Sequence, residues 1–183
     1  MSYKSELKRA VARSLESGLM PSGFSVQTKN LNDKKLKDIL SGLQGFFQHQ
    51  INQGFVTRDQ YRISCLRSAE LTCELLRSVN CSCLLTFGNV LRDSKPFFKW
   101  NADNVIDEIR RSEGSAEKVE LHAWVTVGDC IVDPTILPFA QPAEWLKPGF
   151  GNFIHCQDIS MHKPFEYRPL LCGEAVLQSL MPG

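Results

Sequence analysis

Two stretches near the start of the chain alternate apolar and polar side chains with the period of an α-helix. In Ser5–Leu19, leucine, alanine and valine recur every three or four positions, and most of the charged side chains lie between them. A second stretch follows Asn32 and Asp33, which can cap a helix, and carries a broad apolar stripe as far as Ile51. We therefore predict two amphipathic helices. The first would dock on the domain or on a second copy of the chain.

A third helical stretch begins near Ser64 or Cys65, after the turn-like segment Asn52–Asp59. Its apolar positions wrap around most of the circumference, which is typical of a helix buried in the centre of a domain. We expect the helix to end at Asn80, because asparagine tolerates the left-handed backbone conformation. Cys65 would then lie at the N-terminus of a central helix.

Strand-like patterns begin after this helix, with the apolar run Cys83–Val90. The following connection, Arg92–Ala102, has the composition of a loop and contains Trp100. We predict a short helix over Asn104–Arg111, followed by the loop Ser112–Ser115. Because this excursion joins two strands, it is either a lid or specificity element or a surface connection with an aromatic side chain packed in the core.

The clearest hairpin in the sequence is Leu121–Asp133. A two-residue turn at Gly128 and Asp129 would pair the flanking residues as Val127 with Cys130, Thr126 with Ile131, Val125 with Val132 and Trp124 with Asp133. Side chains alternate between the two faces of a strand, so His122 and Asp133 share one face as diagonal neighbours, about 7–8 Å apart between backbones. At this separation their side chains can form a hydrogen bond.

The C-terminal part of the sequence is rich in proline, glycine and aromatic residues, and we expect it to wrap the domain with little regular structure before a short final helix at Gly173–Leu180. A length of 183 residues predicts a single domain. Within it, residues 1–60 would form a helical N-terminal extension, residues 61–136 the core, and residues 137–183 the loop-rich wrap.

Composition excludes several classes of protein. The formal net charge is +1, which provides no strong field to recruit nucleic acid or an anionic membrane, so we expect neither partner. No run of apolar residues approaches the length of a transmembrane helix, and the N-terminus has no signal-like stretch, so a cytoplasmic location is expected. The seven cysteines are then expected to be reduced.

Three residues in this pattern fit nucleophilic catalysis. A cysteine at a helix N-terminus is stabilised as a thiolate by backbone N–H groups and the helix dipole. Cys65 would attack a carbonyl carbon, His122 would transfer the proton, and Asp133 would orient the imidazole. The backbone N–H of Cys65 would help to hold the oxyanion. An upstream glutamine amide could also serve as oxyanion donor, and the candidates are Gln44, Gln48, Gln50, Gln53 and Gln60.

The sequence also resembles the transglutaminase-like superfamily. The resemblance rests on Cys65–Gly88, on His122-Ala123-Trp124-Val125 and on Asp133-Pro134-Thr135. The approach to the cysteine, Arg62–Ser68, is similar to that of the small bacterial proteases that mature lasso peptides. This resemblance implies a papain-like α+β fold, with the Cys-headed helix packed on an antiparallel sheet. It implies chemistry at amide or thioester carbonyls, without a metal or cofactor, on a peptide or protein substrate.

One departure from the superfamily's pattern, and two rival interpretations, stay open. Asn80–Cys83 replaces the usual turn after the helix. A zinc site could draw on Cys81, Cys83, His155, Cys156, His162 and Cys172, although none of these pairs has the spacing of a zinc knuckle. The chain could instead be a non-catalytic module that binds peptides, because fold does not fix function. A homodimer, if one forms, would use the N-terminal helices.

Overall fold

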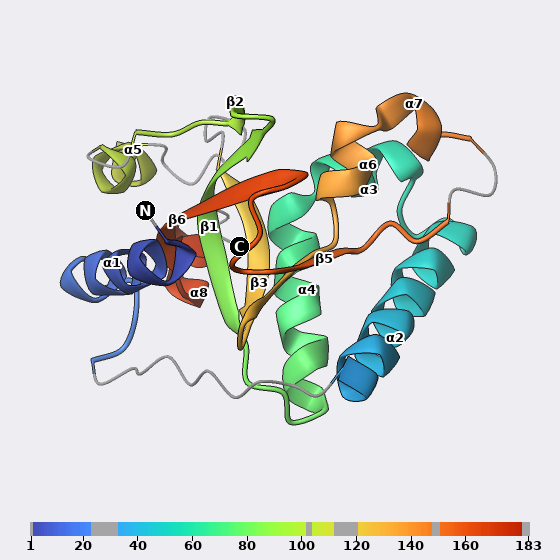
Figure 1. The fold of residues 1–183 in the computed structure, drawn as a ribbon, viewed down its shortest axis with the longest axis horizontal. Coiled ribbons are helices and arrows are strands. Elements are labelled where there is room, and N and C mark those ends of the chain that lie inside the picture. Colours follow the sequence, from blue (N-terminus) through green and yellow to red (C-terminus); the bar gives the residue numbers. More distant parts are fainter. Residues whose placement is uncertain (1, 23–32, 102–103, 112–120, 148–150, 181–183) are drawn as a thin grey trace. The chain divides into compact units, whose positions relative to one another are not determined.

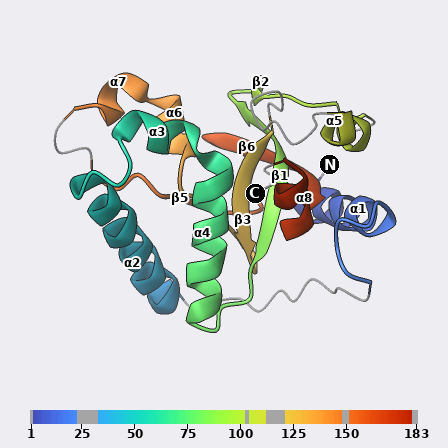
Figure 2. The ribbon, with the colours of Figure 1, turned by 180° about the vertical axis from the view of Figure 1, so that it is seen from behind.

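The computed structural model describes residues 2–22, 33–101, 104–111, 121–147 and 151–180 and shows an α+β fold, as predicted. The chain divides into two compact units, each assembled from separate stretches of sequence. The first unit consists of residues 1–26, 84–123 and 158–183, and the second of residues 27–83 and 124–157. Figure 1 labels most of the elements of both units, and Figure 2 shows the chain from behind.

The first unit is built on three antiparallel strands. Strand β1 (Leu84–Arg92) pairs with β2 (Lys95–Phe98) and with β6 (Phe165–Cys172). Helix α1 (Tyr3–Glu16) packs against β6, and helices α5 (Val105–Arg111) and α8 (Glu174–Leu180) contact each other. The apolar face of α1 is thus buried against its own chain, which is the first of the two dockings expected from the sequence.

Two polar contacts fasten α1 to β6. Arg13 Nη1 donates a hydrogen bond of 2.7 Å to the carbonyl oxygen of Leu170, and the backbone N–H of Cys172 donates one of 2.9 Å to Ser14 Oγ. Ser14 is fully buried, and buried polar groups need hydrogen-bond partners; the N–H of Cys172 provides one for its hydroxyl.

The second unit consists of helices around the central hairpin. Its helices are α2 (Asp33–Asn52), α3 (Arg58–Ile63), α4 (Cys65–Ser78), α6 (Ile136–Ala140) and α7 (Pro142–Trp145). Its strands are β3 (His122–Val127), which enters this unit at Trp124, then β4 (Cys130–Asp133) and β5 (His155–Asp158), which leaves it after Gln157. Helix α4 contacts α2 and α3, and α3 contacts α6.

The hairpin has the predicted register. Strands β3 and β4 are antiparallel and pair Val125 with Val132, Thr126 with Ile131 and Val127 with Cys130. Gly128 begins the two-residue turn with a φ of 56°, a conformation that glycine adopts without strain. Every residue of β3 is buried, so both faces of this strand belong to the core.

Other predictions from the sequence needed correction. Part of the turn predicted at Asn52–Asp59 is helical, because Thr57 caps α3. The connection Arg92–Ala102, predicted as a loop, contains β2. Besides the predicted final helix, the C-terminal part of the chain contains helices α6 and α7 and strands β5 and β6. Leu19 lies outside α1, which ends at Glu16. Asn80 has the expected left-handed backbone, with a φ of 54°. The predicted cap at Asn32 and loop at Ser112–Ser115 lie outside the described residues.

In the part of the chain that the structure describes, no helix combines the length and the apolar character needed to cross a membrane.

Candidate active site

Cys65 is the first residue of the fourteen-residue helix α4, as the sequence predicts. Its side chain is partly exposed, whereas the buried face of the same helix carries Ser68, Ala69, Thr72, Cys73 and Leu76. These buried side chains anchor the helix in the core. The thiol of Cys65 lies at the N-terminus, which is the positive end of the helix dipole. Negative charge at this position is favoured by the helix dipole.

The residue that caps α4, Ser64, makes no side-chain hydrogen bond to the helix backbone. Its hydroxyl instead donates to the carbonyl oxygen of Tyr61 at 2.8 Å and lies 2.9 Å from Ser68 Oγ. A serine at this position usually accepts a bond from the first-turn N–H groups. Because Ser64 does not, its hydroxyl does not occupy those N–H groups.

Tyr61 connects the approach to Cys65 with the turn that follows Asp133. Its hydroxyl donates a hydrogen bond of 2.9 Å to the carbonyl oxygen of Pro134, and its side chain is only 1% exposed. Burial, and secondarily the negative charge of Asp133, raise the pKa of this hydroxyl well above its usual range. The phenol consequently remains a hydrogen-bond donor throughout the physiological pH range.

Three aromatic side chains fix the position of Tyr61. Its ring packs against Phe47 of α2, Trp145 of α7 and Phe153, with centroid separations of 5.2, 5.5 and 5.3 Å. Trp145 and Phe153 also contact each other, edge to face, at 5.0 Å. Such pairs add to the stabilisation that burial of the rings provides. Side chains from several elements of the second unit thus hold α3, the short helix before Cys65, in place.

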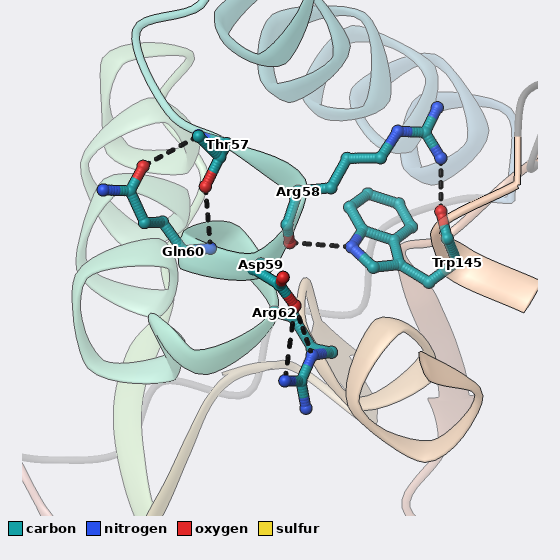
Figure 3. A network of polar contacts seen from close by, with 6 residues as sticks. All are labelled: Thr57, Arg58, Asp59, Gln60, Arg62 and Trp145. Carbon is teal, nitrogen blue, oxygen red and sulfur yellow. Dashed lines mark hydrogen bonds and ion pairs between the residues drawn. The ribbon is translucent and has the colours of Figure 1, made fainter. Parts of the chain in front are cut away.

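Polar contacts of α3 complete this anchorage (Figure 3). Thr57 and Gln60 form a capping box, in which Thr57 Oγ1 accepts from the Gln60 backbone and Gln60 Oε1 accepts from the Thr57 backbone. Trp145 Nε1 donates to the carbonyl oxygen of Arg58 at 2.8 Å, and the Arg58 guanidinium donates to the carbonyl oxygen of Trp145 and lies over its ring. Reciprocal bonds therefore join α3 to α7.

Asp133 ends strand β4 and is fully buried. Its Oδ1 accepts hydrogen bonds of 2.9 Å from the backbone N–H groups of Thr135 and Ile136, where α6 begins. Asp133 thus acts as the turn former that an aspartate before proline commonly is. These bonds also orient the carboxylate. A carboxylate that positions a histidine needs such a fixed orientation.

His122 begins strand β3, and its side chain is fully buried. The imidazole ring stacks on Phe98 of β2, with the ring centroids 4.5 Å apart and the planes inclined by 19°. The excursion that we considered as a lid therefore contributes a strand and an aromatic platform for the histidine. Stacking restricts rotation of the imidazole.

The three predicted residues are divided between the units. Cys65 and Asp133 belong to the second unit, and Tyr61 connects the segments that carry them. His122 belongs to the first unit. The predicted contacts of His122 with Cys65 and Asp133 accordingly stay predictions.

Three of the glutamines considered as oxyanion donors have structural roles. Gln44 Oε1 accepts from the backbone N–H groups of Phe153 and Ile154 at 3.1 and 3.4 Å, and Gln48 bonds to Asn52 at 2.8 Å within α2. Gln60 belongs to the capping box. Sequence reasoning also missed Tyr61, which lies four residues before Cys65 in the preceding helix, α3.

The second unit contains an apolar hollow of about 430 Å³ between α2 and the end of α4. It is lined by Ile39, Leu43, Phe46, Leu75, Leu76 and Val79, with Lys35 and Asp38 among its polar residues. Leu75 lies about 15 Å further along the helix axis than Cys65, given the rise of an α-helix. This hollow is therefore separate from the head of α4.

The zinc interpretation gains no support. Within the described part of the chain, no three side chains of His, Cys, Asp or Glu are grouped as a metal site would require. All seven cysteines, each in a described segment, are thiols.

Comparison with protein-family models, with curated proteins and with solved structures found no match.

Proposed function

We propose that this chain is a cysteine-dependent hydrolase or acyl transferase that acts on the amide bond of a peptide or of a glutamine side chain. Cys65 is the nucleophile, His122 the general base and acid, and Asp133 the carboxylate that orients His122. The observation that carries the proposal is the place of Cys65. It is a partly exposed thiol on the first residue of a long helix whose cap residue directs its hydroxyl elsewhere.

In the proposed reaction, His122 takes the proton of the Cys65 thiol while the sulfur attacks the amide carbon. The tetrahedral oxyanion is held by backbone N–H groups at the head of α4. His122 then protonates the departing amine, and a thioester remains on Cys65. Water hydrolyses the thioester, or a second amine accepts the acyl group. This sequence of steps needs no oxidant, metal or cofactor.

Two features of the second unit support the proposal. Asp133 is buried and oriented by two backbone donors, so its carboxylate has a fixed direction. Tyr61 ties the segment after Asp133 to the segment before Cys65. A site in which the reacting groups are held by buried neighbours loses little free energy in reorganisation when the transition state forms.

The proposed setting is the cytoplasm, and the proposed substrate is a peptide or protein. A reducing compartment agrees with an odd number of cysteines, seven, in a chain of this length. The near-neutral charge of +1 offers nothing that would favour a nucleic acid or a membrane surface over a peptide.

The test is the rate at which each cysteine reacts with iodoacetamide between about pH 5 and pH 9. Trypsin separates Cys65 (residues 63–67) from Cys83 (residues 78–92), so mass spectrometry of the peptides assigns the label. We expect rapid labelling of Cys65 that persists at low pH in the wild type and becomes slow in His122→Ala. Cys65→Ala should lose only this signal.

Cys156 is the internal control, because burial and the neighbouring Cys130 raise the pKa of its thiol to about 12. Labelling of Cys65 as slow as that of Cys156, in a folded protein, would contradict the catalytic proposal and favour the peptide-binding module. A screen of peptide and glutamine amides, with Cys65→Ala as the blank, then identifies the substrate class.

A further inference from the structure

A second thiol site lies on α4, well along the helix from Cys65. Cys73 Sγ and Cys83 Sγ are 3.0 Å apart and share a hydrogen bond. The same Cys83 sulfur is 3.5 Å from the carbonyl oxygen of Cys73, within reach of a weak S–H bond. Both residues belong to the second unit, so the pair is part of one compact body.

The two thiols differ in exposure, and the more exposed one has a lowered pKa. Cys73 is buried at 1% exposure, whereas Cys83 is partly exposed at the end of the segment that follows α4. The hydrogen bond from Cys73, together with the nearby Arg77 guanidinium, lowers the pKa of the Cys83 thiol despite its partial burial. Cys83 is thus the more exposed of the two thiols and the one whose thiolate is favoured, and Cys73 is buried.

Cys81 and Cys156 show what distinguishes Cys83. Cys81 is buried, and burial, followed by the proximity of Cys83, raises its pKa. The pKa of Cys156, which hydrogen bonds to Cys130, is raised to about 12. Of these three residues only Cys83 has a lowered pKa, because its sulfur shares a hydrogen bond with Cys73 and lies near the Arg77 guanidinium.

We propose that Cys73 and Cys83 form a peroxide-reactive site, in which Cys83 is oxidised first and Cys73 resolves it to a disulfide. This site is independent of the proposed chemistry at Cys65. The proposal rests on the sulfur separation, the exposure of Cys83 and the burial of Cys73.

The reaction balances with one molecule of peroxide. The Cys83 thiolate attacks one peroxide oxygen, the O–O bond breaks, and the other oxygen leaves as hydroxide, which gives a sulfenic acid on Cys83. The Cys73 sulfur then attacks the Cys83 sulfur, the S–O bond breaks, and the oxygen leaves as water with the thiol proton. Two thiols lose two electrons and two protons, and hydrogen peroxide becomes two molecules of water.

Closing the disulfide needs only a small displacement. A disulfide has a sulfur separation of about 2.05 Å, so the two sulfurs must approach by about 1 Å. The bond would join the middle of α4 to the chain just before β1.

The experiment uses full-length Cys65→Ala, so that failure of the catalytic proposal cannot affect the result. The protein is exposed to one equivalent of hydrogen peroxide, the remaining thiols are blocked with N-ethylmaleimide, and the tryptic peptides are analysed without reduction. We expect residues 68–77, which contain Cys73, to be linked to residues 78–92, which contain Cys83. Dithiothreitol should release the two peptides. Cys83 should be consumed at least about tenfold faster than Cys156.

Cys81→Ser is the matched control, since it removes the other thiol of residues 78–92. The link should persist in Cys81→Ser at a rate within about twofold of the parent, and vanish in Cys83→Ser. In Cys73→Ser, oxidation should stop at a sulfenic acid that dimedone traps on Cys83, a result that does not depend on the fold of Cys83→Ser. A link that persists in Cys83→Ser, or sulfonic acid on Cys83 beside a reduced Cys73, would overturn the proposal.

Discussion

The hydroxyl of Tyr61 donates a hydrogen bond of 2.9 Å to the carbonyl oxygen of Pro134. Pro134 follows Asp133 directly, and Tyr61 lies four residues before Cys65. Through this one bond, two segments far apart in the sequence, each carrying a residue of the proposed triad, are fixed within the second unit. Tyr61 is therefore a positioning residue in the proposed site.

Tyr61→Phe tests this role with the smallest possible change. The ring and its contacts with Phe47, Trp145 and Phe153 should remain, but the buried carbonyl oxygen of Pro134 would lose its donor. We expect a loss of about 1–3 kcal/mol in the free energy of unfolding, measured by denaturant titration. The labelling rate of Cys65 should also fall.

Tyr61→Leu provides the comparison, because it removes the ring contacts as well. It should be destabilised more than Tyr61→Phe by a further few kcal/mol. Labelling of Cys65 at the wild-type rate in folded Tyr61→Phe would assign Tyr61 a purely structural role.

Asp133 has two roles that a pair of substitutions can separate. The amide oxygen of asparagine can still accept from the backbone N–H groups of Thr135 and Ile136, whereas alanine leaves both buried donors unpaired. Asp133→Asn should therefore fold with stability close to that of the wild type, and Asp133→Ala should lose about 2–4 kcal/mol.

Activity should respond differently from stability, because the proposed function of Asp133 needs its charge. We expect Asp133→Asn to lose His122-dependent labelling of Cys65 although it is folded. If Asp133→Asn retains this labelling across the pH range, the carboxylate serves only the turn.

The elements that could be predicted are those whose signal is local. Helical periodicity located α1, α2 and α4, and the glycine turn with its flanking valines fixed the register of the β3–β4 hairpin. Strand β6 escaped prediction because its partner, β1, lies far away in the sequence and the strand itself contains a proline. The pairing of β1 with β6 is tertiary information that no local pattern carries.

The residues of the candidate site also fall into those that local sequence signals could predict and those that they could not. Cys65, His122 and Asp133 could be selected from their types and positions, because a helix start and a hairpin register are local features. Tyr61 could not, because its role depends on a carbonyl oxygen 73 residues away. The stacking of His122 on Phe98 likewise depends on β2, which was predicted as a loop.

Gly88 should be intolerant of any side chain. It lies at a register shift between β1 and β6, and a Cβ atom there would be 2.2 Å from the carbonyl oxygen of Arg168 and 3.0 Å from the backbone nitrogen of Leu170. Since backbone cannot move aside as a flexible side chain can, we expect Gly88→Ala to cost about 2–4 kcal/mol in denaturant unfolding.

Gly45→Ala is the matched control for Gly88→Ala. Gly45 lies within α2, and a Cβ there would meet nothing within 4 Å. Alanine should stabilise this helix by about 0.5–1 kcal/mol. Equal stability changes for the two substitutions would contradict the close approach of β6 to Gly88.

Cys172 gives a prediction for alkaline pH. The residue is fully buried on β6, and burial raises the pKa of its thiol to about 12, against an ordinary value of 9.0. Below pH 9 the thiol is protonated in both folded and unfolded protein, so Cys172 does not change how stability depends on pH in that range. Between pH 9 and 12 the unfolded chain releases this proton and the folded chain retains it, so stability must fall as the pH rises.

Cys172→Ala isolates this effect, because its loss of packing does not change with pH. The wild-type advantage over Cys172→Ala should shrink by about 1.4 kcal/mol for each pH unit above 9. Denaturant unfolding of both proteins at about pH 8 and pH 10 measures the change. An advantage that is the same at both values would mean that the folded protein releases the Cys172 proton as readily as the unfolded chain does.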